Sequence, residues 1–147
     1  MGKKILKLYL VALVLGLLTG TVASCFQLAI TYVEHGLQVF FVMMQKLGLS
    51  IEFVSAMTSM TLVLLACLAI KYIAPQASGS GIPEIEAALL HKRKLDWKRL
   101  LPVKFIFGVL SIAAKMIAGR EGPTIQMGGN LGKMLGDFFG LSEHRKD

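Results

Sequence analysis

The sequence has 147 residues, of which 54% are hydrophobic and only 17% are charged, and its mean hydropathy is +0.64. Soluble domains carry about 25% charged residues, so this composition is that of a membrane protein and not of a soluble domain. The 16 Lys and Arg residues outnumber the 9 Asp and Glu residues, for a net charge of +7, but they lie in short clusters between apolar runs. That pattern is typical of cytoplasmic loops and excludes nucleic acid as the expected partner.

The run from 8 to 33 predicts the first membrane-spanning helix. It holds 26 residues without a charge, and a helix needs about 20 to cross a bilayer. Three lysines lie within residues 1–7, so the positive-inside rule places this N-terminal segment in the cytoplasm. The first helix is therefore expected to run outward.

A second interpretation of the N-terminal run is a cleaved lipoprotein leader. Its basic start, the apolar residues 8–18 and the segment 22–25, which ends in Cys25, fit such a leader. Apolar residues continue over 26–30, however, where a mature lipoprotein would turn polar. A retained membrane span is therefore favoured, with cleavage at Cys25 as the alternative.

Residues 53–74 predict a second span, which returns to the cytoplasmic side. Its core, 53–70, is a run of 18 residues without a charge, close to the length that a spanning helix needs. Residues 34–36 (Glu-His-Gly) are expected to end the first helix. The amphipathic stretch 37–49 then joins the two spans.

The cysteines and histidines predict neither an enzyme nor a metal centre. Cys25 and Cys67 each lie inside an apolar run, without a CxxC motif or a Cys/His cluster, so both are expected to be small buried thiols. The histidines at 35, 91 and 144 form no convincing catalytic arrangement with Ser, Asp or Cys. We therefore expect no metal, no cofactor and no catalytic activity.

Residues 75–147 are expected to hold broken helices instead of complete spans. A Gly/Ser-rich break over 75–83 is followed by a short helical stretch over 84–90. The most basic segment, 91–99, is expected to be a solvated cytoplasmic linker, with Trp97 at the level of the lipid headgroups.

Two shorter apolar segments follow. The first, 105–118, is interrupted by Lys115 and is too short for a simple lipid-facing span. A break over 119–123 separates it from the second, 124–139. Residues 142–147 are charged and are expected to face the cytoplasm or solvent.

Two motifs of the form Gly-x-x-x-Pro break the apolar sequence, at 79–83 and 119–123. Proline is favoured in the first turn of a helix, and the preceding glycines let the backbone turn and approach a ligand. The first N–H groups of each following helix have no intrahelical acceptor and carry the positive end of the helix dipole, so an anion is their natural partner. Inside a bilayer such breaks survive only within protein or along a cavity, and paired interrupted helices form ion sites in transporters.

Two polar side chains within these motifs are candidate functional groups. The hydroxyl of Ser80 can donate to an anion, and it can also cap the helix that follows. Glu121 carries a carboxylate that would occupy the anion site when ionised and leave it when protonated, which makes it a candidate gate and proton carrier. A salt bridge from Glu121 to Arg120 or Lys115 is an alternative with equal support.

These motifs resemble those of the CLC family of chloride channels and proton-coupled chloride transporters, and of the bacterial H+/Cl− exchangers in particular. The matching stretches are 79–86, 101–105 and 119–132. The resemblance implies an all-α integral membrane fold, of which this chain would be an N-terminal fragment: the first part, about helices A to F, of an inverted repeat with broken and re-entrant helices. The third filter segment, the tyrosine that closes the central site and the inner proton-transfer glutamate would lie later in a full-length member.

The resemblance also implies roles for individual residues. The selectivity-filter motifs would be Gly79, Ser80, Gly81, Ile82 and Pro83, and Gly119, Arg120, Glu121, Gly122 and Pro123. Within them, chloride would be bound by Ser80, Gly81, Ile82, Arg120, Glu121 and Gly122. Ser80 would coordinate the central chloride, and Glu121 would be the gating glutamate and external proton-transfer group. Lys104 matches a buried lysine below the pathway, whereas Lys115 replaces a small residue and so predicts altered local packing.

The function implied by the resemblance is chloride transport, as an H+/Cl− antiporter. The alternatives are a passive chloride channel of the same family, and a membrane interaction protein or lipoprotein without transport activity. The transported ions would be chloride and protons, and the protein would be a homodimeric, multi-pass component of the bacterial inner membrane. This chain alone is expected not to complete a transport pathway.

Overall fold

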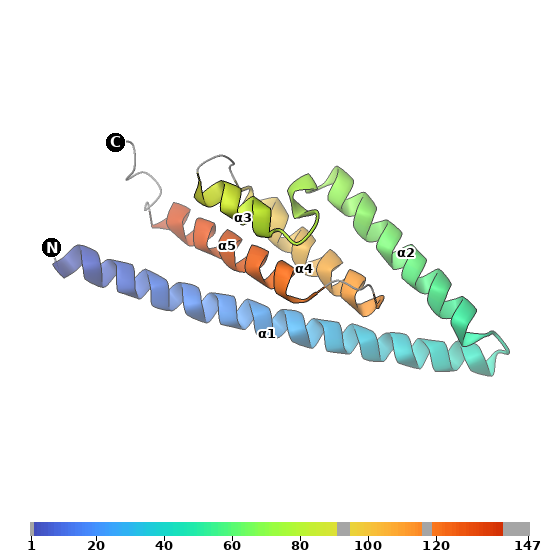
Figure 1. Cartoon of the computed structure of the whole chain (residues 1–147). Helices are drawn as coiled ribbons and strands as arrows, with labels where there is room; N and C mark the ends of the chain where they lie inside the picture. The colour runs from blue at the N-terminus through green and yellow to red at the C-terminus, as the bar shows by residue number, and fades with distance from the viewer. Residues whose placement is uncertain (1, 91–94, 116–118, 140–147) are drawn as a thin grey trace.

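The computed structural model describes residues 2–90, 95–115 and 119–139, and every regular element within these ranges is helical (Figure 1). The elements in chain order are α1 (Gly2–Lys46), α2 (Ile51–Tyr72), the 3-10 helix η1 (Pro75–Ala77), α3 (Ile82–Leu89), α4 (Trp97–Ala113) and α5 (Glu121–Phe138). The expectation of an all-α chain is confirmed. Three parts of the predicted segments lie outside the described residues. They are 91–94 of the basic linker, 116–118 of the apolar segment 105–118, and 142–147 at the charged end.

α1 is a single helix of 45 residues. At 1.5 Å per residue it is about 67 Å long, roughly twice the thickness of the hydrocarbon core of a bilayer. The helix end expected at 34–36 is therefore wrong. A lone glycine inside a helix costs only about 1 kcal/mol, and the half-buried face of α1 continues past Gly36 through Leu37 and Phe41. The helix stops instead before Gly48, whose φ of 82° is readily adopted by glycine.

The part of α1 before Cys25 packs against the rest of the chain. Leu15 lies against Gly132 of α5, and Thr19 lies against Gly128, with side-chain carbons within 4 Å of where a glycine Cβ would stand. Cleavage at Cys25 would remove these contacts. The packing therefore favours the retained helix over the lipoprotein alternative.

α1 runs antiparallel to α5 and contacts it at both ends. The Lys7 ammonium donates a hydrogen bond to the carbonyl of Phe139, just past the C-terminus of α5, at 3.3 Å. At the opposite end, Glu34 Oε1 lies 3.8 Å from Arg120 Nη2, at the N-terminus of α5. The first pair places a cation at the negative end of the helix dipole, where it is favourable.

α1 and α2 are long and apolar enough to cross a membrane. In α2, the half-buried and buried positions recur at the three- and four-residue spacing of one helix face, from Ile51 to Ile70. The opposite faces of both helices expose large apolar side chains, among them Leu13, Leu17, Leu28, Met60, Leu64 and Leu68. Exposed apolar faces of this kind suit contact with lipid, which does not penalise them as water does.

α4 packs against α1, α2 and α5 and so joins the long helices to the broken ones (Figure 1). A buried cluster on this interface consists of Phe26, Ile30, Val109, Ile112 and Met127. The ring of Phe26 meets Phe105 edge-on, with centroids 5.5 Å apart. A second cluster, of Ala74, Ala77, Leu100 and Val103, fixes η1 against α4.

α4 begins at Trp97, inside the segment 91–99 that was expected to be a linker. Trp97, Lys98 and Arg99 are helical and are not part of a loop. The start of α4 is held against the end of α5 by two contacts of Trp97. Its Nε1 donates to Asp137 Oδ2 at 3.2 Å, and its ring centroid lies 6.3 Å from that of Phe138. These contacts come from the end of α5, which local sequence cannot reveal.

The expectation of buried thiols is also wrong, since both Cys25 and Cys67 are exposed in this chain. Cys25 precedes the buried Phe26 and lies on the adjoining outward side of α1. Cys67 follows the buried Ala66 and faces an open cavity between α2 and α4. An apolar run does not show which of its faces is packed, because the lipid-facing side is equally apolar.

We expect the substitution Phe26→Ala to lower the free energy of unfolding by about 3 kcal/mol, because it leaves a cavity between α1, α4 and α5. Thermal or denaturant unfolding of the purified chain in detergent would measure it. Leu28→Ala, two residues away on the exposed side, is the matched control and should change stability by less than about 0.5 kcal/mol. Equal losses for the two variants would contradict the assigned core.

Candidate functional site

The first Gly-x-x-x-Pro motif forms a tight loop before α3. Residues 78–81, here called the Ser80 loop, place Ser80 between two glycines in the left-handed region, Gly79 with φ of 66° and Gly81 with φ of 77°. Such angles are favourable only for glycine, which explains both positions. α3 then begins at Ile82, with Pro83 in its first turn, where the missing N–H of proline costs nothing.

The Ser80 hydroxyl oxygen accepts a hydrogen bond from the Ile82 N–H at 3.4 Å. The N-cap residue of α3 is Gly81, without a side-chain cap, so the capping considered from sequence is limited to this long bond from the first N–H of the helix. The hydroxyl proton is not used in this bond and can still be donated, so capping is compatible with anion coordination.

The second motif starts α5 two residues before its proline. Glu121 and Gly122 are the first two residues of the helix, Pro123 is the third, and Arg120 precedes them. The side-chain oxygen of Thr124 donates back to the Arg120 carbonyl at 2.8 Å, which reinforces this first turn. Pro123 thus lies in the first turn of the helix, as its motif predicts, and α5 begins three residues before the apolar segment 124–139.

The two motifs meet directly. A Cβ added to Gly122 would stand 2.8 Å from the Ser80 carbonyl oxygen and 3.0 Å from its Cα. On the other side of the loop, a Cβ on Gly81 would overlap the side chain of Gln126. These glycines allow the backbone of the Ser80 loop to lie against the first turns of α5.

Lys104 holds the loop from the side of α4. Its ammonium donates to the carbonyl of Ala77 at 2.9 Å and to that of Gly79 at 2.7 Å. The side chain is 7% exposed, as expected for the buried lysine that the family resemblance implies. The buried ammonium group is tolerated here because two carbonyl oxygens accept hydrogen bonds from it.

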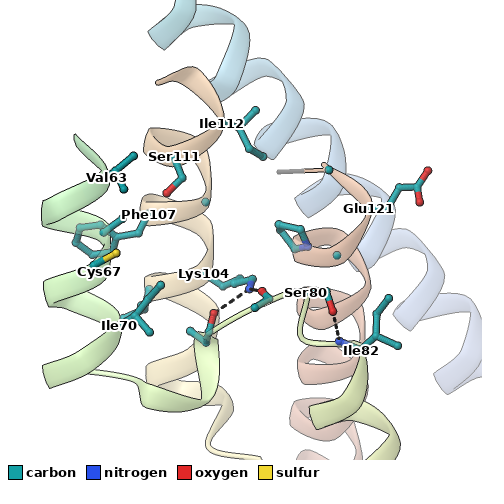
Figure 2. A pocket seen from close by; sticks show the side chains of 18 residues that line it. Val63, Cys67, Ile70, Ser80, Ile82, Lys104, Phe107, Ser111, Ile112 and Glu121 are labelled. Carbon is teal, nitrogen blue, oxygen red and sulfur yellow. Dashed lines mark hydrogen bonds between the residues drawn. The ribbon is translucent and has the colours of Figure 1, made fainter. Parts of the chain in front are cut away.

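A pocket of about 490 Å³ lies beside this contact, between α2, α4, the Ser80 loop and the start of α5. Ser80, Lys104, Glu121 and Gly122 line it, together with apolar side chains such as Phe107. Figure 2 shows that the Glu121 carboxylate is directed away from Ser80 and Lys104 although the residue borders the same pocket.

The predicted chloride-binding residues are only partly brought together. Those that line the pocket are Ser80, Ile82, Glu121 and Gly122. Gly81 instead faces Gln126, and Arg120 faces Glu34 on α1. Of the remaining filter residues, Gly79, Gly119 and Pro123 line the pocket.

Glu121 is exposed, and within the described ranges it forms no ion pair with Arg120 or Lys115. Arg120 is paired with Glu34. Lys115 lies just past the end of α4 with φ of 58°, a left-handed conformation that usually takes glycine at a helix C-terminus. The position singled out for altered packing thus terminates α4.

Sequence reasoning missed two buried amides on α5. Gln126 is fully buried, and its Nε2 donates to the Gln76 carbonyl at 2.9 Å. Asn130, one turn later and also buried, donates to the Gln126 carbonyl at 2.7 Å. Two amides four residues apart on the packed face of an apolar helix are a signal, because buried polar groups require partners.

Comparison with known proteins gives one consistent relationship. Residues 62–147 match the family model described as voltage gated chloride channel. The chain is 41% identical over 134 residues to the H(+)/Cl(-) exchange transporter ClcA of Salmonella arizonae, and 39% identical over 134 residues to that of Citrobacter koseri. Each alignment covers 91% of this chain and 28% of the relative, so the chain spans just over a quarter of the length of these relatives.

We expect Gly122→Ala to destabilise the protein by about 1–3 kcal/mol, because the added methyl group would press on the Ser80 carbonyl. Gly136→Ala in the same helix has open space around its Cβ and should instead stabilise by up to about 1 kcal/mol. Thermal unfolding in detergent distinguishes the two. A stabilising effect at both positions would show that the two motifs are not in contact.

Lys104→Met should lower the free energy of unfolding by about 3 kcal/mol, since two hydrogen bonds from a charged donor are lost. The control is Lys98→Met, on the exposed side of the same helix, where the ammonium lies 5.6 Å from the Trp97 ring centroid. An exposed cation–π contact is worth less than about 1 kcal/mol. Similar unfolding curves for the two variants would argue against the bracing role of Lys104.

Proposed function

We propose that this chain, which belongs to the voltage gated chloride channel family, contributes a chloride-binding site to a transporter that exchanges chloride for protons. The observation that carries the proposal is the contact between Ser80 and Gly122. It brings the starts of two interrupted helices, α3 and α5, to one pocket with a carboxylate at its border.

The electrostatics of these helix starts suit an anion. The first N–H groups of α3 and α5 lack intrahelical acceptors, and both helix dipoles present their positive ends here. The Ser80 hydroxyl adds a neutral donor and Lys104 a nearby positive charge. A halide needs only such donors, whereas a cation would be repelled.

The position of Glu121 supports proton coupling. Its carboxylate is the first side chain of α5 and borders the pocket. When ionised it competes with chloride for the same positive helix end, and protonation removes that competition. In the described conformation the side chain points away from Ser80 (Figure 2), which leaves the pocket open to an anion.

The setting that we propose is the bacterial inner membrane, with α1 and α2 as spans. Their apolar outer faces support this placement. The homodimer implied by the family resemblance stays a prediction, as does the assignment of exchange over passive conduction.

A chimera tests the proposal. This chain would replace its matching segment in the exchange transporter of Salmonella arizonae, which supplies the remaining length of the protein, and the product would be reconstituted in liposomes. We expect a chloride gradient to drive proton movement. A chimera that elutes as a folded, monodisperse protein but moves no chloride would overturn the proposal.

In this chimera Glu121→Ala should abolish chloride-driven proton movement while chloride flux persists, because the residue carries the proton and competes with the anion. Proton movement is followed with an external pH electrode and chloride with an ion-selective electrode. Glu52→Ala, an exposed carboxylate in the first turn of α2, is the control and should leave both fluxes unchanged. Chloride flux without proton coupling in the unsubstituted chimera would instead indicate a passive channel.

A further inference from the structure

We propose that Gln126 is a positioning residue that locks the Ser80 loop onto α5 and thereby sets the anion preference of the site. This inference rests on the proposed function, because anion preference has meaning only for a protein that binds or moves anions. Nothing in the chemistry of chloride binding itself requires a glutamine at this position.

Gln126 contacts the chain both before and after Ser80. Its Nε2 donates to the carbonyl of Gln76 at 2.9 Å, in the 3-10 helix immediately before the loop. Its side-chain carbons lie against Gly81, on the far side of Ser80, so closely that no Cβ fits there. One side chain therefore holds both η1 and the last residue of the Ser80 loop.

Burial makes the bond from Gln126 to Gln76 costly to break. Gln126 is fully buried, so it cannot exchange this bond for one to water without moving the loop. Its Oε1 is already buried without a partner, and loss of the bond would leave its Nε2 unpaired as well, which is unfavourable for a buried donor.

Gln126 lies on the helix that carries Glu121, one and a half turns after it. Lys104 fixes the segment around Ser80 to α4 through the carbonyls of Ala77 and Gly79, whereas Gln126 fixes it to α5. Together with the direct contact between Ser80 and Gly122, Gln126 therefore sets where the Ser80 hydroxyl lies relative to the Gly122 backbone.

That relation determines which anion fits. Chloride is spherical and accepts donors from any direction, whereas nitrate is planar and wider. A site discriminates between them by the distance and angle between its donors, and displacements well below 1 Å alter such discrimination. Loosening the Ser80 loop against α5 should therefore reduce the preference for chloride.

The test compares Gln126→Leu with Asn130→Leu in the chimera described above. Both remove a buried amide of α5, but the Asn130 side chain bonds to the carbonyl of its own helix and not to the loop. The preference for chloride over nitrate, measured from competitive flux, should fall by roughly three- to tenfold in Gln126→Leu, the factor expected from one lost hydrogen bond. In Asn130→Leu it should stay within twofold.

A second measurement needs no transport. Ala77→Cys, at a buried position next to Gln76, is introduced after Cys25→Ser and Cys67→Ser, and a water-soluble thiol reagent reports how often this segment opens. Gln126→Leu should speed modification roughly five- to tenfold, again one hydrogen bond's worth, and Asn130→Leu should not. If the parent chimera moves no anion, the proposed function fails. The rate of thiol modification still shows whether Gln126 holds the loop in place. Equal modification rates in the two variants, or equal changes in anion preference, would overturn the inference.

Discussion

The carbonyl of Ser80 rests against Gly122, and this contact sets how closely the starts of α3 and α5 approach each other. It exists because neither Gly81 nor Gly122 carries a side chain, and because the Ser80 loop, between η1 and α3, turns through two left-handed glycines. The pocket, the placement of the Ser80 hydroxyl and the position of Glu121 at its border all follow from it. The rest of the chain maintains this approach.

Three residues keep the Ser80 loop in place. Lys104 holds the loop from α4, Gln126 holds it from α5, and Ala77 is buried in a cluster with Leu100 and Val103. α4 in turn packs on both long helices. The loop is therefore fixed by tertiary contacts on several sides.

The sequence predicts the helix starts well and the packing poorly. The starts at Ile82 and Glu121 lie within three residues of their predicted places, because the effects of glycine and proline on the backbone are local. The partners of Glu34 and Gln126 lie far along the chain, at Arg120 and Gln76, and no local pattern encodes them. The same limit explains the two wrong expectations, a helix end at 34–36 and buried thiols at Cys25 and Cys67.

The antiparallel pairing of α1 and α5 has a consequence for sidedness. Glu34 stands level with the start of α5, while Lys7 reaches its far end, and their separation of 27 positions corresponds to about 40 Å of helix. Under the positive-inside prediction for the lysine-rich end of α1, the start of α5 would lie near the opposite side of the membrane. Under the proposed function, the lysines at one end of α1 would then decide which compartment supplies protons to Glu121.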